Sequence, residues 1–71
     1  MDKGERRRLA DNLLRLMGDM TVVRLAELTG IARTTLINYR CGRTDPSAIA
    51  VAKIAKALGC TTDELLEGVA E

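Results

Sequence analysis

The hydrophobic residues of this chain recur at helical spacing along most of its length. Between Glu5 and Met17, the apolar residues Leu9, Leu13 and Leu16 fall on one face of a helix. No stretch alternates apolar and polar residues as a half-buried strand would. The pattern therefore predicts an all-α chain with five helices, near residues 5–17, 22–29, 33–40, 47–58 and 62–67.

Residues that cap and end helices support these bounds. Gly30 ends the second helix, because glycine tolerates the left-handed backbone that a sharp exit requires, and Gly59 ends the fourth. Thr21 is the expected N-cap of the second helix. Thr61 and Glu64, three residues apart, predict a capping box at the start of the fifth helix.

Two helix starts are less well defined by the sequence. Residues 1–4 are expected to fray, since nothing there is suited to burial. The fourth helix begins in one of two ways. Either Asp45 is its cap and Pro46 its first residue, or Ser47 is the cap.

The apolar side chains must form a core that is almost entirely aliphatic. The chain has 71 residues, of which 46% are apolar, and Tyr39 is its only aromatic residue. This length predicts one domain, spanning 1–71, near the lower size limit of a core that supports itself. The predicted core is Leu9, Leu13, Leu16, Leu25, Ala26, Ile31, Leu36, Ile54, Ala55, Leu58 and Leu65. Further candidates for burial on the fourth helix are Ile49, Val51 and Ala52.

The segment from residue 22 to 41 has the spacing of a helix-turn-helix motif. Ala26 lies four residues before Gly30, so a small side chain stands where two helices must cross closely. Ile31 then returns to the core, and Leu36 and Tyr39 give the second helix an apolar face. Such a second helix can enter the major groove of DNA.

This segment resembles the helix-turn-helix of the lambda repressor-like, XRE/Cro family. The resemblance extends over about residues 9–66, including the loop Y-R-C-G-R-T-D-P and the last two helices. It implies a compact five-helix domain and a cytoplasmic, bacterial or phage-encoded transcriptional regulator that binds double-stranded operator DNA in the nucleoid. Phage repressors of the Cro type, controller proteins and antitoxins all remain compatible with it.

Four residues of the second motif helix point outward and are the candidates for reading bases. They are Arg33, Thr34, Ile37 and Asn38. Arg33 could form two hydrogen bonds with guanine, and Asn38 could pair with adenine. Thr34 could reach a base or a phosphate. Ile37 is either a contact to a thymine methyl group or an isolated apolar surface residue.

The candidates for phosphate contacts lie in the more basic part of the chain. Residues 1–46 hold nine Lys/Arg and six Asp/Glu, net +3, whereas residues 47–71 hold two and four, net −2. A local basic face attracts phosphates even though the whole chain has a net charge of only +1. The candidates are Thr21, Arg40, Arg43, Arg6 and Arg7. For the arginines near residue 6, the alternative is a solvated helix start.

Three positions depart from the family pattern. Val22 replaces a common glutamine, Ala32 replaces a Ser/Thr cap, and Arg40 stands where a glutamate often pairs with the residue at Arg15. Asp11 could bridge to either arginine, or Arg40 could face the DNA backbone. These departures favour an alternative function, a protein-interaction module that kept the fold without sequence-specific DNA binding. Thr29, where an aliphatic residue is usual, could hydrogen-bond back one turn.

A homodimer is expected, because one recognition helix reads too few base pairs to find a site in a genome. Since the chain ends soon after its fifth helix, the interface is expected within the domain itself. Its candidates are Leu66, Val69 and Cys60. In the alternative, Leu66 and Val69 cover the bottom of the core in a monomer.

Other functional classes find little support in the sequence. The chain has no histidine, no Gly-rich phosphate loop and no paired-carboxylate motif, so we expect no enzyme, cofactor or small-molecule ligand. Cys41 and Cys60 are expected to be reduced thiols, and two cysteines without histidine make a metal site very unfavourable. No apolar run approaches the roughly 20 residues that cross a bilayer.

Overall fold

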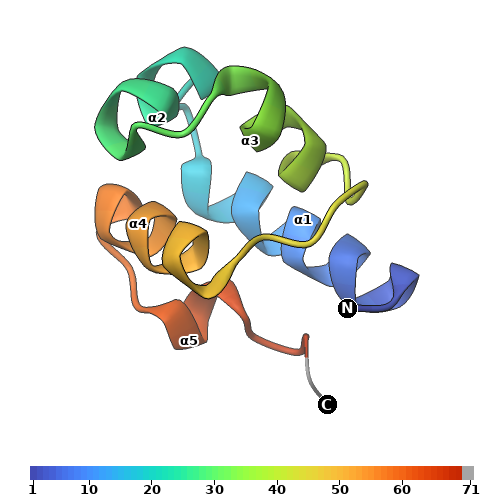
Figure 1. Ribbon diagram of the computed structural model, residues 1–71. Helices are drawn as coiled ribbons and strands as arrows, with labels where there is room; N and C mark the ends of the chain where they lie inside the picture. The colour runs from blue at the N-terminus through green and yellow to red at the C-terminus, as the bar shows by residue number, and fades with distance from the viewer. Residues whose placement is uncertain (70–71) are drawn as a thin grey trace.

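The structure, a computed structural model, describes residues 1–69. These residues form five helices and no strand, as predicted (Figure 1). The helices are α1 (Lys3–Met17), α2 (Val22–Thr29), α3 (Arg33–Arg40), α4 (Ala48–Leu58) and α5 (Thr62–Leu65). The predicted bounds of α2 and α3 are confirmed at both ends. Helix α1 starts two residues early, α4 starts one residue late, and α5 ends two residues early.

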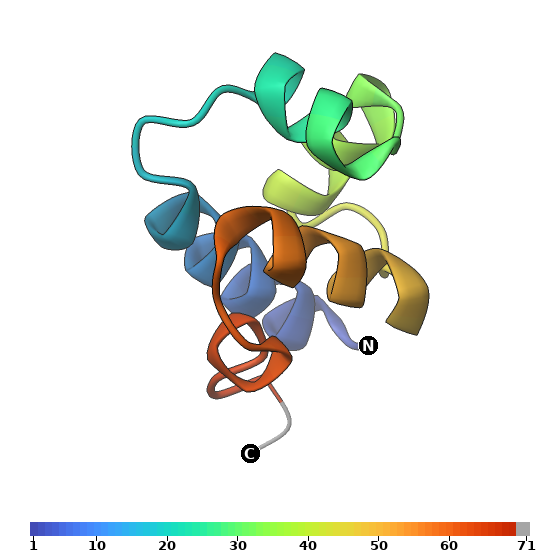
Figure 2. The same cartoon turned by 90° about the vertical axis from the view of Figure 1, so that its left-hand side faces the viewer.

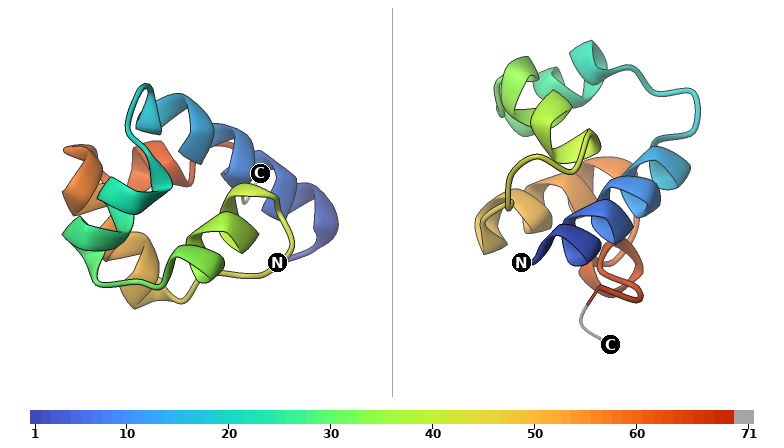
Figure 3. Two further views of the ribbon diagram at one scale, coloured as in Figure 1. Left: turned by 90° about the horizontal axis from the view of Figure 1, so that it is seen from above. Right: turned by 90° about the vertical axis from the view of Figure 1, so that its right-hand side faces the viewer.

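The helices are arranged so that α2 and α3 lie together at one end of the molecule, above α4 and α5 in the view of Figure 1. Helix α1 packs against α3 and α5, and α4 packs against α2 and α5. Figure 2 and the right-hand view of Figure 3 show that α2 and α3 stand clear of α5, on the other side of α1 and α4. The recognition-helix candidate, α3, is therefore held at the surface by its packing against α1 and α2.

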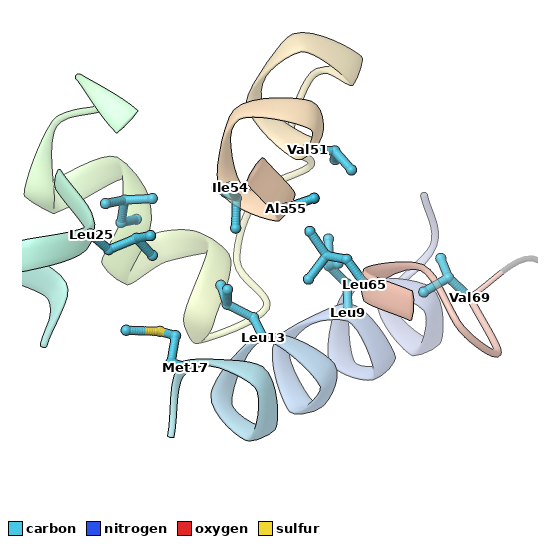
Figure 4. Close-up of a cluster of buried hydrophobic side chains, with 10 residues drawn as sticks. Leu9, Leu13, Met17, Leu25, Val51, Ile54, Ala55, Leu65 and Val69 are labelled. Carbon is cyan, nitrogen blue, oxygen red and sulfur yellow. The ribbon is translucent and has the colours of Figure 1, made fainter. Parts of the chain in front are cut away.

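The core lies where α1, α2, α3, α4 and α5 converge. Its most deeply buried large side chains are Leu13, Leu25, Leu36 and Leu65, which come from four different helices. Side chains of α1 point towards those of α4, as Figure 4 shows for Leu13 and Ile54. Each buried leucine removes apolar surface from water, an effect worth about 1.5–3 kcal/mol for a fully buried side chain.

Most of the predicted core is confirmed. Buried as predicted are Leu9, Leu13, Leu25, Leu36, Ile54, Ala55 and Leu65. Only partly buried, packed against this cluster, are Leu16, Ala26, Ile31 and Leu58. Val51 is buried, but the predicted burial of Ile49 and Ala52 is wrong. The side chain of Ile49 is 69% exposed, because α4 turns a different face inward, the one carrying Ala50 and Ile54.

The predicted fraying of residues 1–4 is also wrong. The Asp2 carboxylate accepts a hydrogen bond from the backbone N–H of Glu5, and the Glu5 carboxylate accepts one from the N–H of Asp2, both at 2.8 Å. This reciprocal capping box satisfies two of the amides that a helix start leaves without partners. Helix α1 therefore begins at Lys3.

Of the two predicted starts of α4, the structure has the one capped by Ser47. The Ser47 hydroxyl accepts a hydrogen bond of 3.1 Å from the N–H of Ala50. Asp45 is engaged elsewhere, since its carboxylate lies 2.9 Å from the Met1 amine and 3.3 Å from the Arg6 guanidinium. Two opposite charges hold Asp45 at the start of α1 and away from the start of α4.

Candidate nucleic-acid interface

The turn between α2 and α3 is built from local hydrogen bonds. Gly30 has a φ of 74°, in the left-handed region, and its N–H donates to the carbonyl of Ala26 at 2.8 Å. The Thr29 hydroxyl donates to the Leu25 carbonyl one turn back, at 2.7 Å, as the sequence suggested. The same oxygen accepts from the N–H of Ile31 at 3.2 Å. The threonine therefore fixes both sides of the turn that sets the angle between the two helices.

The outward face of α3 carries the four predicted base-reading residues. Arg33 and Thr34 are exposed, Ile37 is 37% exposed, and Asn38 is half-buried. The opposite face of α3 packs inward through Leu36, which is buried, and Tyr39, which is half-buried. The structure thus brings the four side chains onto the surface of one short helix at the exposed end of the molecule (Figure 3).

The two helices of the motif start differently. Thr21 caps α2 with its side chain, since its hydroxyl oxygen accepts a hydrogen bond of 3.1 Å from the N–H of Arg24. Ala32 precedes α3 and makes no side-chain cap. The first amides of α3 therefore lack the side-chain acceptor that a serine or aspartate would supply. The methyl group of Ala32 also cannot offset the positive end of the α3 dipole, which attracts anions.

Three of the five predicted phosphate-contacting residues lie in the segment from the start of α2 to the loop after α3. Thr21 is exposed at the start of α2, Arg40 is half-buried in the last turn of α3, and Arg43 is exposed in the loop that follows. Within residues 1–69, no carboxylate lies within ion-pair distance of Arg33, Arg40 or Arg43. Their charges are therefore uncancelled by direct partners in the described part of the chain.

The other two predicted phosphate residues, Arg6 and Arg7, are already engaged. Arg6 donates to the carbonyl of Met1 at 2.8 Å as well as to Asp45, and its side chain is largely covered. Arg7 lies 3.4 Å from Asp11, one turn further along α1. Both residues start α1 beside the loop that follows α3, since Gly42 of that loop lies close to the backbone of Arg6 and Arg7. Arg6 is largely covered by its contacts, whereas the exposed Arg7 guanidinium keeps further N–H donors that a phosphate could accept from.

The contact between Asp45 and the start of α1 changes the acidity of both partners. A hydrogen bond from the Met1 amine, followed by one from Arg6, holds the pKa of Asp45 below its ordinary value. The same contact raises the pKa of the Met1 amine, since the carboxylate stabilises its charged form. This ion pair ties the loop between α3 and α4 to α1.

Arg40, which departs from the family pattern, does not form an ion pair with Asp11, and neither does Arg15. Asp11 pairs with Arg7, so the interpretation that it bridges Arg15 or Arg40 is wrong. Asp11 is four residues from both Arg7 and Arg15, so helical spacing permits either pair, and the structure has the one with Arg7. Arg15 instead lies 3.9 Å from Glu67 and donates a long hydrogen bond of 3.4 Å to Asn12.

Sequence reasoning missed one polar residue that fixes the last part of the chain. Asn12 on α1 is only 3% exposed, and its side-chain amide donates to the backbone carbonyls of Leu65 and Glu67, at 3.0 and 2.8 Å. It lies between Leu9 and Leu13 on the sequence. Its position next to the apolar face of α1 is the only signal from which its burial could have been inferred.

The three predicted dimer-interface residues all contact the core to some degree. Val69 is 6% exposed and belongs to the core itself (Figure 4). Leu66 and Cys60 are half-buried and pack against it. Burial, with a smaller effect of the nearby Glu64 carboxylate, raises the pKa of the Cys60 thiol. Val69 therefore has little side-chain surface to offer a partner, and Leu66 has more.

Other kinds of site are not apparent in the described part of the chain. Within residues 1–69, no three side chains of the types that ligate metals come together. No helix in that range is both long enough and apolar enough to span a membrane.

Comparison with known proteins assigns the family. A family model described as helix-turn-helix matches residues 13–65, which runs from the middle of α1 to the end of α5. Comparison with curated proteins and with solved structures gave no match. The match covers most of the chain and includes the whole α2–turn–α3 segment described above. The chain belongs to the XRE/lambda repressor-like helix-turn-helix family of DNA-binding transcription regulators.

Proposed function

We propose that this protein is a sequence-specific regulator that docks α3 in the major groove of operator DNA. The observation that carries the proposal is the outward face of α3, where Arg33, Thr34, Ile37 and Asn38 are grouped over a buried Leu36. An α-helix fits the major groove, and these side chains offer hydrogen-bond donors, an acceptor and an apolar group to base edges.

Each base-reading residue has a distinct chemical role in this proposal. Arg33, at the first turn of α3, donates two parallel hydrogen bonds to the O6 and N7 atoms of guanine. Ile37 packs on a thymine methyl group, which its exposure of 37% allows. The Thr34 hydroxyl and the Asn38 amide are smaller polar groups that can also hydrogen-bond to base edges.

The phosphate contacts come from residues that flank this face. Thr21 donates its hydroxyl proton, since its oxygen already accepts from the Arg24 amide. Arg40 and Arg43 supply positive charge at the other end of α3. Such contacts fix the register of the protein on the duplex and carry no sequence information of their own.

Binding to DNA as a homodimer follows from the small number of base pairs that one α3 can read. Leu66 lines a mostly apolar groove of about 370 Å³ between the start of α4 and α5, with Pro46, Ala48 and Val51 among its other walls. Because a two-fold interface uses the same patch on both subunits, this groove is the proposed contact, with Leu66 in its wall; Cys60 is not among its lining residues. Val69 supports the patch from inside the core.

The test of DNA binding is a fluorescence-anisotropy titration of labelled duplex at several salt concentrations. The duplex is first selected from random oligonucleotides and compared with a scrambled control. Phosphate contacts predict that log K falls linearly with log salt, with a slope of about −0.9 per contact. A protein-interaction module, the alternative function, predicts no selected sequence and no tight complex with either duplex.

Sedimentation tests the proposed dimer on the selected palindrome. Leu66→Glu places a charge in the groove and is expected to abolish cooperative binding of two subunits. Leu14→Glu is the matched control, since Leu14 is 49% exposed on the outer side of α1 and away from this groove. Circular dichroism must show that both variants fold. A folded Leu66→Glu protein that still bound the palindrome cooperatively would place the interface elsewhere.

A further inference from the structure

Asn38 and Arg43 are joined by two hydrogen bonds at the end of α3. The backbone N–H of Arg43 donates to the carbonyl of Asn38 at 2.9 Å. The Arg43 guanidinium, through Nη1, also donates to Oδ1 of the Asn38 side chain at 3.5 Å, a long hydrogen bond. One base-reading candidate is thus in contact with one phosphate candidate.

The loop geometry fixes where Arg43 can lie. The preceding residue, Gly42, has a φ of 71°, in the left-handed region. A Cβ atom on Gly42 would lie 3.4 Å from the carbonyl oxygen of Arg6, so the loop passes closely over the start of α1. A backbone held on both sides keeps the Arg43 side chain within reach of Asn38.

The chemistry of the two groups decides which way the Asn38 amide faces. A guanidinium has only donors, so the amide atom that it faces must be the oxygen. The amide nitrogen, Nδ2, then points away from the guanidinium and can donate to another acceptor. A pair of hydrogen bonds with adenine needs both atoms, because Oδ1 must accept from N6 while Nδ2 donates to N7. With Arg43 at Oδ1, the adenine amine would have to approach an oxygen that already faces a cation.

We propose that Arg43 selects the base that Asn38 reads, by holding its Oδ1 atom so that only the Nδ2 donor faces the groove. The preferred base is then guanine, whose O6 and N7 are both acceptors in the major groove. This replaces the adenine predicted from the residue type alone. Arg43 is a positioning residue here, acting through Asn38. The inference rests on the proposed DNA-binding function.

Selection from random duplexes with four proteins tests it. The proteins are the wild type, Asn38→Ala, Arg43→Met and Arg43→Lys. Asn38→Ala identifies the base pair that Asn38 reads, since preference is lost there. At that base pair we expect guanine for the wild type and a shift of about tenfold towards adenine for Arg43→Met, which keeps an unbranched stem but has no donor. Arg43→Lys retains a donor and should retain most of the guanine preference.

Arg40→Met provides a control for loss of a nearby charge. Arg40 is also in the last turn of α3 but makes no side-chain bond to Asn38 within the described residues. It should weaken binding to all sequences alike and leave the preferred bases unchanged.

The outcomes separate the two proposals. If the wild type selects adenine at the Asn38 base pair, or if Arg43→Met leaves the preference there unchanged, Arg43 does not orient Asn38 and the inference is wrong. In either case the protein still selects a sequence, so the proposed function stands. If the wild type selects no sequence at all, the proposed function fails and this inference fails with it.

Discussion

Asn12 on α1 donates a hydrogen bond of 3.0 Å to the backbone carbonyl of Leu65, the last residue of α5. A second bond from the same amide reaches the carbonyl of Glu67 at 2.8 Å. The end of a helix leaves carbonyl groups without partners inside the helix, and burial makes such groups costly to leave unpaired. Asn12 satisfies the carbonyl of Leu65 at the end of α5 and also binds that of Glu67 in the turn that follows, and so fixes the turn that carries Leu66 and Val69.

Replacing this amide should destabilise the protein. We expect Asn12→Ala to lower the free energy of unfolding by about 2 kcal/mol, because the buried Leu65 carbonyl loses its donor and the Glu67 carbonyl keeps only the one from Arg8. Urea denaturation followed by circular dichroism measures the change. Arg7→Ala is the control, since its exposed contact with Asp11, at 3.4 Å, does not involve Asn12 and should contribute less than about 0.5 kcal/mol. Equal stabilities of Asn12→Ala and wild type would show that the two carbonyls find water instead.

The start of α3 offers a stabilising change. Ala32 has an extended ψ of 142° and makes no side-chain cap, so a serine there could accept from the amides of the first turn. Ala32→Ser is expected to raise the free energy of unfolding by about 1 kcal/mol. Thr21→Ala, which removes the existing cap of α2, should lower it by a similar amount. The midpoints of urea denaturation compare the three proteins, and no gain from serine would show that its hydroxyl does not cap the first-turn amides.

Acid should weaken the contact between Asp45 and the start of α1. The pKa of Asp45 is lowered in the folded protein, chiefly by the Met1 amine and then by Arg6. The contact therefore stabilises the fold at pH values above the ordinary carboxyl pKa, and this contribution is lost as the pH falls through the lowered value. Carbon-13 NMR titration of the Asp45 carboxyl should show the lowered pKa. Acetylation of the Met1 amine should bring the pKa of Asp45 most of the way back to its ordinary value, and Arg6→Gln should do so to a smaller extent. An ordinary pKa in the unmodified protein would contradict the ion pair.

Arg33 should contribute most to base discrimination. We expect Arg33→Ala to cost about 1–3 kcal/mol of binding free energy on the best site and to relax the preference at one base pair. Anisotropy titrations on the selected duplex and its single-base variants measure both effects. Unchanged selectivity in Arg33→Ala would assign base reading to the other exposed residues of α3, with Asn38 the first to test.

The helices could be predicted from the sequence because their signals are local. Thr21, Gly30 and Gly59 mark helix ends through the conformations of single residues and their nearest amides. Asp2 and Glu5 carry the same kind of signal, a capping box, which the expected fraying of residues 1–4 overlooked. The exposure of Ile49 was missed because α4 begins with a continuous apolar run. Such a run does not indicate which face of the helix is buried, and only packing against the other helices decides it.

In the candidate site, too, local features could be predicted from the sequence and tertiary contacts could not. The outward position of Arg33, Thr34 and Ile37 follows from helical periodicity, so it was predictable. The engagement of Arg6 with Asp45 and of Asn38 with Arg43 depends on how the loop between α3 and α4 folds back across the molecule. Contacts between side chains 39 or 5 residues apart leave no pattern in a single sequence.

The most direct test of the central claim, that α3 and its flanking residues contact DNA, is an NMR titration. Nitrogen-15-labelled protein is titrated with the selected duplex, and shifts of the backbone amides are followed. The account predicts the largest changes over Arg33–Arg40, at Thr21 and at Arg43, with small changes at the start of α1. Changes confined to the groove near Leu66, or no changes at all on adding DNA, would contradict it.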